Sequence, residues 1–371
     1  MENQIQSSPT ARIRRSAAPT GLLACCILGL LASPSRADYD FTKMIQPVPP
    51  TAKFEDPGFI VWCGSMVRDE AGKCHLFYSR WPSRLGHYAW VTHSEVAHAV
   101  ADQPLGPYLF VDVALPERGA EQWDGHCTHN PTVLKFGAKY YLYYMGNRGD
   151  RKPGTSLNWS HRNHQRIGVA VADSPAGPWI RRDRPLIEPT PGFHDALCLA
   201  NPSVAQRPDG GYLMVYKAVA DKGKPPFGGP VVHVVATSDQ PTGPFHKHPN
   251  PVFTKAGSSF PAEDPYIWRG TDRYWAIVKD FQGGFTVKGP SLALFQSKDG
   301  IDWSTAAHPL VSTLELHWSD GGSEPLSKLE RPQVYLENGE PAVLFCAAAP
   351  AGKLNQSFNV QIPLQAAPPR N

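Results

Sequence analysis

The chain has few cysteines, and none of them stands in the C-x-x-C spacing of a zinc site. Two of the seven, Cys25 and Cys26, lie in an N-terminal segment that we expect to be removed, which leaves five at wide intervals. An odd number without paired spacing gives no indication of a disulfide framework. We interpret Cys127 and Cys198, which occupy equivalent places in a repeat, as small apolar packing residues, and a bridge between repeat units is the alternative.

Long hydrophobic runs are also missing. The most apolar stretch, residues 21–32, has about a dozen apolar residues, whereas a membrane-spanning helix needs about 20. Arginines precede it and Ser35-Arg36-Ala37 follows it, which is the pattern of a secretory signal peptide. We therefore expect residues 1–37 to be a signal peptide and residues 38–371 to form one domain that is secreted or periplasmic, with no membrane attachment. A lipoprotein box ending at Cys25 is the alternative.

An excess of positive charge is absent as well. Residues 1–37 contain four arginines and one glutamate, so their removal takes Lys+Arg from 36 to 32 and Asp+Glu from 33 to 32. Proteins that bind nucleic acid usually carry a basic excess or a basic stripe, and here only residues 161–166 form a small basic cluster. We expect no nucleic-acid partner.

Signals for long helices are weak, because 38 prolines and 32 glycines interrupt the chain. A phrase of the form Asp-x-Pro-x-Gly-Pro-aromatic recurs instead, at intervals of 71, 66 and 60 residues between its aspartates. Its copies are Asp102–Tyr108, Asp173–Trp179, Asp239–Phe245 and a degenerate Asp299–Trp303. Such a recurrence indicates a chain built from one repeated unit, and the aspartates are interpreted as structural turn residues.

A second series interleaves with the first and consists of two polar or small residues before a proline. It comprises His129-Asn130-Pro131, Ala200-Asn201-Pro202, Glu263-Asp264-Pro265 and Glu330-Arg331-Pro332. Each is followed by a strand, a turn and a second strand, and the same hairpin occurs upstream in residues 65–78. Five units of about 60 to 75 residues predict an all-β fold, a five-bladed β-propeller with four-stranded antiparallel blades around a central channel.

The residues before each inner strand should converge at one mouth of that channel. Several carboxylates, among them Glu263, Asp264 and Glu330, would then meet near tryptophan and histidine. Cleavage of a glycosidic bond requires one protonated carboxyl and one ionised carboxylate, and crowding drives their pKa values apart. The constellation therefore favours carbohydrate chemistry.

These repeats and blade starts resemble the five-bladed β-propeller glycoside hydrolases related to family 43, over the whole predicted mature chain, either within that family or in a separate sister family. The resemblance implies three acidic residues: a base in the first blade, an orienting aspartate in the third and a proton-donating glutamate in the fourth. Carried over by motif, Glu263 matches the donor and Asp195 the orienting residue. The first blade reads Trp62-Cys-Gly-Ser65 and lacks the expected carboxylate, so Asp124 is the preferred base and Asp56 the alternative.

Further residues are expected to bind substrate through aromatic faces, hydrogen bonds or charge. They are Trp62, Trp81, His126, His129, Asn130, Asn201, Lys217, Asp264, Lys279, Glu330 and Arg331. Trp90 and Trp123 are further aromatic candidates. Together with Arg162 and Arg166, the cations among these residues could hold a carboxylate or sulfate, so the carbohydrate could be anionic.

The resulting hypothesis is a secreted glycoside hydrolase that cleaves a plant or algal poly- or oligosaccharide. A carbohydrate-binding propeller without catalysis and a propeller phosphorylase are the alternatives. No cofactor and no metal is predicted. The resemblance nevertheless allows a structural cation in the channel, for which His129 and His126 are the candidate ligands.

Overall fold

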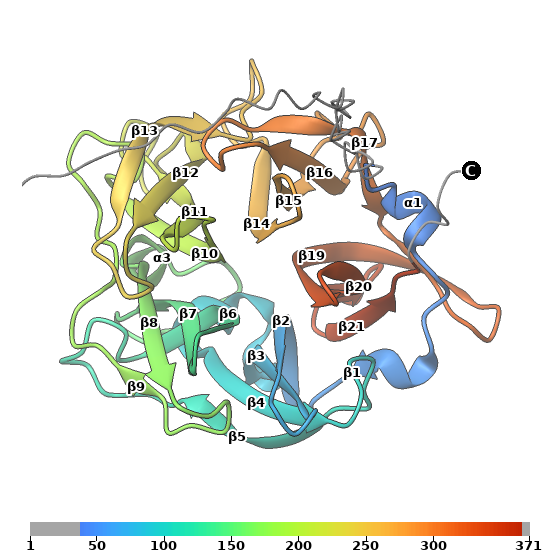
Figure 1. The fold of residues 1–371 in the computed structure, drawn as a ribbon. Helices are drawn as coiled ribbons and strands as arrows, with labels where there is room; N and C mark the ends of the chain where they lie inside the picture. Colours follow the sequence, from blue (N-terminus) through green and yellow to red (C-terminus); the bar gives the residue numbers. More distant parts are fainter. Residues whose placement is uncertain (1–37, 366–371) are drawn as a thin grey trace, which may run out of the picture. The chain divides into compact units, whose positions relative to one another are not determined.

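The hairpins expected from the repeats pair into five sheets arranged in a ring around a central axis (Figure 1). The computed structural model of the chain describes residues 38–365. The prediction of a five-bladed β-propeller with antiparallel blades is therefore confirmed. The signal-peptide prediction concerns residues 1–37, which lie outside the described residues.

Four blades each contain four strands in simple order from the channel outward. Blade one consists of β2 (Phe59–Arg68), β3 (Cys74–Pro82), β4 (Glu95–Ala101) and β5 (Leu109–Leu115). Blade two consists of β6 (Cys127–Phe136), β7 (Lys139–Asn147), β8 (Arg166–Ala172) and β9 (Ile180–Arg181). Blade three consists of β10 (Cys198–Gln206), β11 (Tyr212–Val219), β12 (Val231–Ser238) and β13 (His246–Val252). Blade four consists of β14 (Ala262–Arg269), β15 (Tyr274–Asp280), β16 (Ser291–Ser297) and β17 (Ser304–Thr313).

Blade five closes the ring with a strand from the other end of the described chain. Its sheet contains β19 (Ser323–Glu337), β20 (Glu340–Pro350), β21 (Phe358–Pro363), β1 (Lys53–Phe54) and the short β18 (Glu315–His317). Strand β1 pairs with β21, with Lys53 opposite Val360 and Phe54 opposite Asn359. Because β1 directly precedes blade one, this pairing ties the first blade to the last.

Helical segments are short and lie in the connections. They are α1 (Phe41–Met44), α2 (Trp90–His93), α3 (Trp159–Asn163) and the 3-10 turns η1 (Pro50–Ala52), η2 (Ser83–Leu85) and η3 (His87–Ala89). Across residues 38–365, the structure contains no helix with the length and apolar character needed to span a bilayer.

The repeated Gly-Pro-aromatic phrase forms the turn between the third and fourth strands of a blade. Its glycines Gly106, Gly177 and Gly243 have φ angles of 83°, 84° and 77°, a conformation that is strained for other residues. Its aromatic residue packs inward, as Trp179 does against Phe77 at a ring distance of 5.2 Å. The phrase is therefore structural, as expected.

Each inner strand contains a bulge at the x-x-Pro position. The strand register shifts there in all five blades, and two residues have no partner on the second strand. The first of the two has a positive φ angle in every blade: Cys63 (56°), Asn130 (55°), Asn201 (54°), Asp264 (57°) and Arg331 (54°). A bulge re-aims the side chain that it contains, and here it directs five side chains towards one another around the axis.

Apolar side chains fill the space between neighbouring blades. Trp268 and Leu294 of blade four pack with Leu344 and Phe358 of blade five, and similar clusters lie at the other interfaces. Burying one such side chain contributes about 1.5–3 kcal/mol. The hydrophobic core is thus a set of wedges between blades, which leaves the polar residues of the inner strands for the channel.

The two faces of the ring differ in their loops. On the face where the inner strands begin, the second and third strands are joined by long segments, residues 83–94, 148–165, 220–230 and 281–290. On the opposite face the first and second strands are joined by segments as short as residues 137–138 and 338–339. Binding residues concentrate on long loops held by a rigid scaffold, so we expect the site on the face with the long loops, which we call the mouth face.

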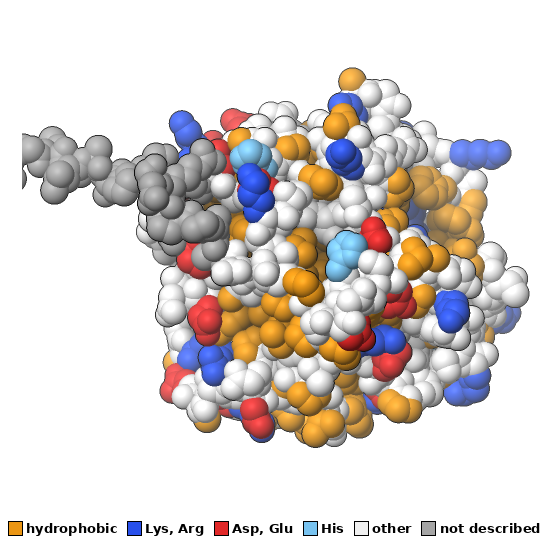
Figure 2. All heavy atoms as spheres, turned by 90° about the vertical axis from the view of Figure 1, so that its right-hand side faces the viewer, with side chains coloured by type: hydrophobic (Ala, Val, Ile, Leu, Met, Phe, Trp, Pro, Cys, Tyr) orange, Lys and Arg blue, Asp and Glu red, His pale blue; other side chains and the backbone are white. Residues whose placement is uncertain are grey.

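The outer wall of the ring carries charges of both signs. Figure 2 shows the side that faces right in Figure 1, where basic and acidic side chains are scattered around hydrophobic atoms without a region of one sign. On this side the mixture of both signs agrees with the near-neutral composition.

Candidate functional site

A ring of side chains surrounds the axis at the five bulges. The Cys63 thiol donates to Asn130 Oδ1 at 2.7 Å, and Asn130 Nδ2 donates to Asn201 Oδ1. Asn201 Nδ2 donates to Asp264 Oδ1 at 2.6 Å, and the Arg331 backbone N–H donates to Asp264 Oδ2 at 3.3 Å. All five residues are buried. We call them the axial ring.

Four members of the axial ring, Asn130, Asn201, Asp264 and Arg331, had been expected to bind substrate, and their contacts within the ring argue against that role. Asn130, Asn201 and Asp264 were predicted to bind substrate, but the structure directs their hydrogen-bonding groups to one another. Burial and the nearby Glu263 carboxylate raise the pKa of Asp264 well above its usual range. Arg331 is 1% exposed, and its guanidinium Nη1 lies 3.7 Å from Asp264 Oδ1. These residues link the inner strands, whereas the three side-chain nitrogens of Arg331 are buried without a hydrogen-bond partner.

A row of alternating charges lies beside the ring on the mouth face. Lys217 Nζ is 2.7 Å from Glu263 Oε1, and Lys279 Nζ is 3.8 Å from Glu263 Oε2. Lys279 also contacts Glu330 Oε1, which Lys328 approaches to 3.1 Å. The side chains of Lys217, Glu263, Lys279 and Glu330 are 10–18% exposed. Each of these two lysines extends from the second strand of one blade to the inner-strand glutamate of the next, so four predicted site residues do meet.

The ammonium groups control the ionisation of this row. Burial alone would raise the pKa of Glu263, but the charges of Lys217 and Lys279 outweigh it and lower the pKa well below the usual range. Burial also disfavours the charged form of Lys279, but Glu330 and Glu263 raise the pKa of Lys279 above its ordinary value. Glu263 and Lys279 are therefore ionised in the free protein at neutral pH.

Two histidines that sequence reasoning missed lie beside the two glutamates. Burial lowers the pKa of His87 to about 4 against the opposing effect of Glu330, and lowers that of His233 to about 3 against the opposing effect of Glu263. Nδ1 of His87 and Nε2 of His233 are buried without a hydrogen-bond partner. His233 lies opposite Lys217 in the β11–β12 pairing, a register that only the folded sheet reveals. Both imidazoles are neutral.

The expected aromatic platforms are covered rather than open. Trp81 is 1% exposed and donates its indole N–H to the Gly86 carbonyl at 3.1 Å. His129 stacks on Trp90 at 4.9 Å and its Nδ1 lies 2.7 Å from Ser94 Oγ. Trp62 is also buried and meets the edge of His87. The prediction that Trp62, Trp81 and His129 contact substrate needs correction, because the segment 83–94 packs over them.

The partners of Asp124 and Asp195 are not members of the charged row, and both carboxylates are buried. Tyr144 donates to Asp124 Oδ2 at 2.6 Å, and Arg118 and Arg181 pair with the same carboxylate. Tyr216 donates to Asp195 Oδ2 at 2.8 Å, and Lys247 Nζ lies 2.5 Å from that oxygen.

Asp56, the alternative base, makes the same contact in blade one. Tyr78 donates to Asp56 Oδ2 at 2.7 Å, and Arg80 lies 2.8 Å from it. Asp56, Asp124 and Asp195 each stand three residues before an inner strand, so they are one repeated structural position. Because tyrosine and cations already occupy their oxygens, we assign these aspartates a structural role in place of the catalytic one expected.

The arginines Arg162 and Arg166 donate hydrogen bonds to backbone carbonyls of the loops. Arg162 donates to the Phe227 carbonyl at 2.7 Å, and Arg166 donates to the carbonyls of Asn163 and Gln165. His126 lies in a pocket between blades one and two. The expected grouping of Arg162, Arg166 and Arg331 around one substrate anion does not occur.

His129, a candidate ligand for a cation at the axis, is already engaged by a neighbouring side chain. His129 is buried, its Nδ1 is engaged by Ser94, and Arg331 is close enough to depress its pKa further. Within residues 38–365, no three side chains of His, Cys, Asp or Glu converge as a metal site. All five cysteines of this range are free and buried, in agreement with a packing role.

A cavity of about 180 Å³ adjoins the charged row between blades four and five. Lys279, Lys328 and Glu330 line it together with Phe281 and Leu314. Lys279 Nζ lies 4.0 Å from the centre of the Phe281 ring. The cavity therefore combines a carboxylate, two ammonium groups and apolar surface.

No protein-family model and no curated protein matches this chain. Several solved structures do match it in fold. The family 117 glycoside hydrolase Zg3597 from the marine bacterium Zobellia galactanivorans has a TM-score of 0.60 at 17% identity, over 86% of this chain and 89% of that one. A structure described as a glycoside hydrolase has a TM-score of 0.66 at 15% identity, over 89% and 95%. A mutant α-L-arabinanase from Cellvibrio cellulosa has a TM-score of 0.53 at 16% identity, over 87% and 93%. The resemblance to these propellers is confirmed for the fold.

Proposed function

We propose that this chain is a glycoside hydrolase, secreted through its N-terminal signal, that cleaves a plant or algal poly- or oligosaccharide at the charged row. One observation carries the proposal: Glu263 and Glu330, from adjacent blades, contact the same ammonium group at the mouth of the channel. A pair of carboxylates at a partly open site is what glycosidic bond cleavage requires. The fold shared with glycoside hydrolases supports the reaction class.

Glu263 keeps the role of proton donor, and Glu330 takes the part expected of the first-blade carboxylate. In the free protein Lys217 and Lys279 hold Glu263 ionised. A sugar that enters the cavity beside Glu330 displaces water and disturbs the contacts of Lys279 with both glutamates. Burial and the like charge of Glu330 then raise the pKa of Glu263. Glu263 then protonates the leaving oxygen, while ionised Glu330 activates water or attacks the anomeric carbon.

The test is hydrolysis of a panel of neutral, uronic and sulfated polysaccharides by the wild type and by Glu263→Gln and Glu330→Gln. Both variants should lose turnover by about 10²–10⁴-fold while keeping the thermal unfolding of a folded protein. Glu337→Gln is the matched control, because Glu337 is an exposed glutamate at the other end of β19. Turnover that both variants retain would refute the assignment.

A carbohydrate-binding propeller without catalysis is the second candidate. It is favoured by blade one, which places Cys63 rather than a carboxylate at its bulge, and by Asp195, whose oxygens are already held by Tyr216 and Lys247. Glycan binding by the wild type without turnover, with affinity unchanged in Glu263→Gln, would select it. Turnover that requires inorganic phosphate and yields a sugar phosphate would select a phosphorylase instead.

A further inference from the structure

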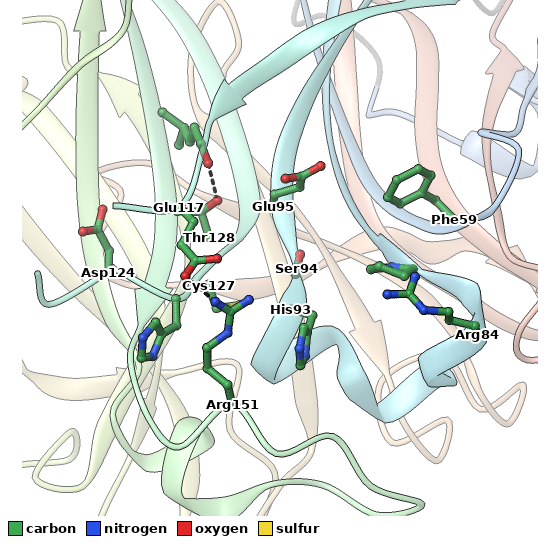
Figure 3. A pocket seen from close by; sticks show the side chains of 13 residues that line it. Phe59, Arg84, His93, Ser94, Glu95, Glu117, Asp124, Cys127, Thr128 and Arg151 are labelled. Carbon is green, nitrogen blue, oxygen red and sulfur yellow. Dashed lines mark hydrogen bonds and ion pairs between the residues drawn. The ribbon is translucent and has the colours of Figure 1, made fainter. Parts of the chain in front are cut away.

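A second pocket of about 270 Å³ opens on the mouth face between blades one and two (Figure 3). It is lined by residues at the ends of β2 to β6 that lie on this face, together with side chains from the loops. The helix α2 separates it from the axis: Trp90, at the start of α2, stacks on His129, and His93, at its end, lines the pocket. The pocket is thus a neighbour of the charged row but not part of it.

Four nitrogen-bearing side chains converge in this pocket. Figure 3 shows His93 between Arg84 and Arg151, and His126 also lines the wall. Burial lowers the pKa of His93, and Arg151, Arg84 and His126 lower it further, with Glu117 acting in the opposite direction. The electrostatic environment of His93 is therefore mainly cationic.

The backbone around Arg151 has a strained conformation and is held by hydrogen bonds to two histidines. Its φ angle is 58°, a strained value for a residue with a side chain. Its backbone N–H donates to His161 Nε2 at 2.8 Å, and the Gly149 N–H donates to His126 Nδ1 at 3.1 Å. Since His126 Nδ1 accepts, the neutral imidazole carries its proton on Nε2 and presents a donor. Strained backbone conformations of this kind cluster at binding and active sites, where they fix the direction of a side chain.

The acidic residues of the pocket are already paired. Glu117 contacts the Arg151 guanidinium, Glu95 lies 2.9 Å from Arg80 Nε, and Asp124 is held by Tyr144 and Arg118. Among residues 38–365, no carboxylate lies within ion-pairing distance of Arg84. One exposed guanidinium therefore faces the pocket without an internal counter-ion.

We propose that this pocket binds an oxyanion substituent, a carboxylate or a sulfate ester, of the carbohydrate whose backbone reaches the charged row. The proposal rests on the proposed function for the nature of the ligand, and it makes the substrate an acidic glycan long enough to pass over α2. Arg84 supplies the uncompensated charge, Arg151, which is paired with Glu117, supplies further N–H donors, and His126 and His93 supply further hydrogen bonds. Guanidinium groups suit both anions because their N–H groups form paired hydrogen bonds with two oxygens.

His93 makes this binding depend on pH. Its Nδ1 lies 2.8 Å from Thr92 Oγ1, and that hydroxyl donates to the Ala89 carbonyl at 3.2 Å, so Nδ1 carries a proton. Nε2 then becomes a donor to an oxyanion only when the ring is protonated. The bound anion stabilises the protonated ring against Arg84, Arg151 and His126, so the affinity should rise as the pH falls through the pKa of His93.

The experiment is calorimetric binding to the full chain of two matched pairs of probes: oligogalacturonate with its methyl ester, and a sulfated galactan oligosaccharide with its desulfated form. At least one charged probe should bind at least about tenfold more tightly than its neutral partner. The pair that shows the difference identifies the anion. Arg84→Gln and Arg151→Gln should remove the preference, and His93→Gln should remove its pH dependence.

Arg207→Gln is the control, because Arg207 lies in the hairpin between β10 and β11 on the opposite face. Equal affinity for charged and neutral probes, or a preference that Arg84→Gln leaves intact, would overturn the proposal. The binding measurement needs no turnover, so its result is independent of the hydrolysis assay. Binding without hydrolysis would refute only the proposed function, and hydrolysis of neutral glycans without charge preference would refute only the pocket.

Discussion

At the scale of single residues, equivalent positions in the five blades carry different side chains, and only some of them are charged. The residue before the bulge is Trp62, His129, Ala200, Glu263 or Glu330, so only blades four and five place a carboxylate there. The opposing second-strand position has a lysine only in blades three and four. Each of these lysines therefore meets the glutamate of the next blade, which confines the charged row to one side of the mouth.

The buried aspartates are structural, and this can be tested by Asp195→Asn. Asp195 Oδ1 accepts from the Thr190 backbone N–H, and Oδ2 accepts from Tyr216 and Lys247. An amide would turn an NH₂ group towards these donors and leave Lys247 without its partner, so the free energy of unfolding should fall by about 3 kcal/mol. Urea unfolding measures this change.

The control for Asp195→Asn is Asp239→Asn, at an exposed turn residue of the repeat. Its stability should stay within about 0.5 kcal/mol of the wild type. Catalytic turnover per folded molecule should be unchanged in both variants. Full stability with lost turnover in Asp195→Asn would return this residue to the catalytic group.

At the scale of elements, the loops between second and third strands differentiate the blades. Residues 83–94 of blade one cover Trp62 and Trp81 and form the wall between the charged row and the second pocket. Residues 148–165 of blade two carry Arg151 and are joined to α2 by Asn147, whose Nδ2 donates to the Val91 carbonyl at 3.1 Å. The scaffold thus repeats, whereas the binding surfaces come from two unlike loops.

Gly149→Ala tests whether the second loop is held as tightly as its contacts indicate. A Cβ at Gly149 would lie 2.4 Å from Cδ2 of the buried His161 ring, which cannot move away freely. We expect a loss of about 1–3 kcal/mol of stability and a displaced Arg151, hence weaker binding of the charged probe. Thermal unfolding and calorimetry measure the two effects.

Gly154→Ala in the same loop is the matched control for Gly149→Ala. The nearest atom to its added Cβ is Ser156 O at 3.6 Å, an ordinary contact. It should leave both stability and binding unchanged. An alanine at residue 149 without effect would mean that the loop rearranges easily, and the positioning of Arg151 would lose its physical basis.

At the scale of the whole molecule, the ring depends on β1. Phe54 packs against Tyr78 of blade one at a ring distance of 4.8 Å while its backbone pairs with β21 of blade five. One short strand therefore contributes to both sides of the closure. Without it, β21 would become an exposed edge, which promotes pairing with other chains.

A chain that starts after Phe54 should melt about 10 °C or more below a chain that starts at Asp38, because it loses the Phe54 contacts and the β1 pairing together with the buried side chains of Phe41, Val48 and Ala52. It should also form larger species in size-exclusion chromatography. Differential scanning calorimetry measures the first effect. Equal melting temperatures and a monomeric truncated chain would show that the blade interfaces alone close the ring.

The number of blades and their strands could be predicted from the amino-acid sequence alone, which also singled out Glu263, Lys217, Lys279 and Glu330 as site residues without their pairing. Each follows from local periodicity or from equivalent places in a repeat, and a repeat transfers geometry from one unit to the next. The turn aspartates were recognised in the same way, since Asp102, Asp173, Asp239 and Asp299 recur in four of the five units.

Tertiary structure alone decided which of the other polar residues meet. Asp124 and Asp195 pair with tyrosines, His87 and His233 lie beside the glutamates, and β1 joins the last blade. These choices depend on contacts between residues far apart in the chain and on which loop covers which side chain. The strand pattern of one blade contains no information about them, because pairing across blades is set by packing of the whole ring.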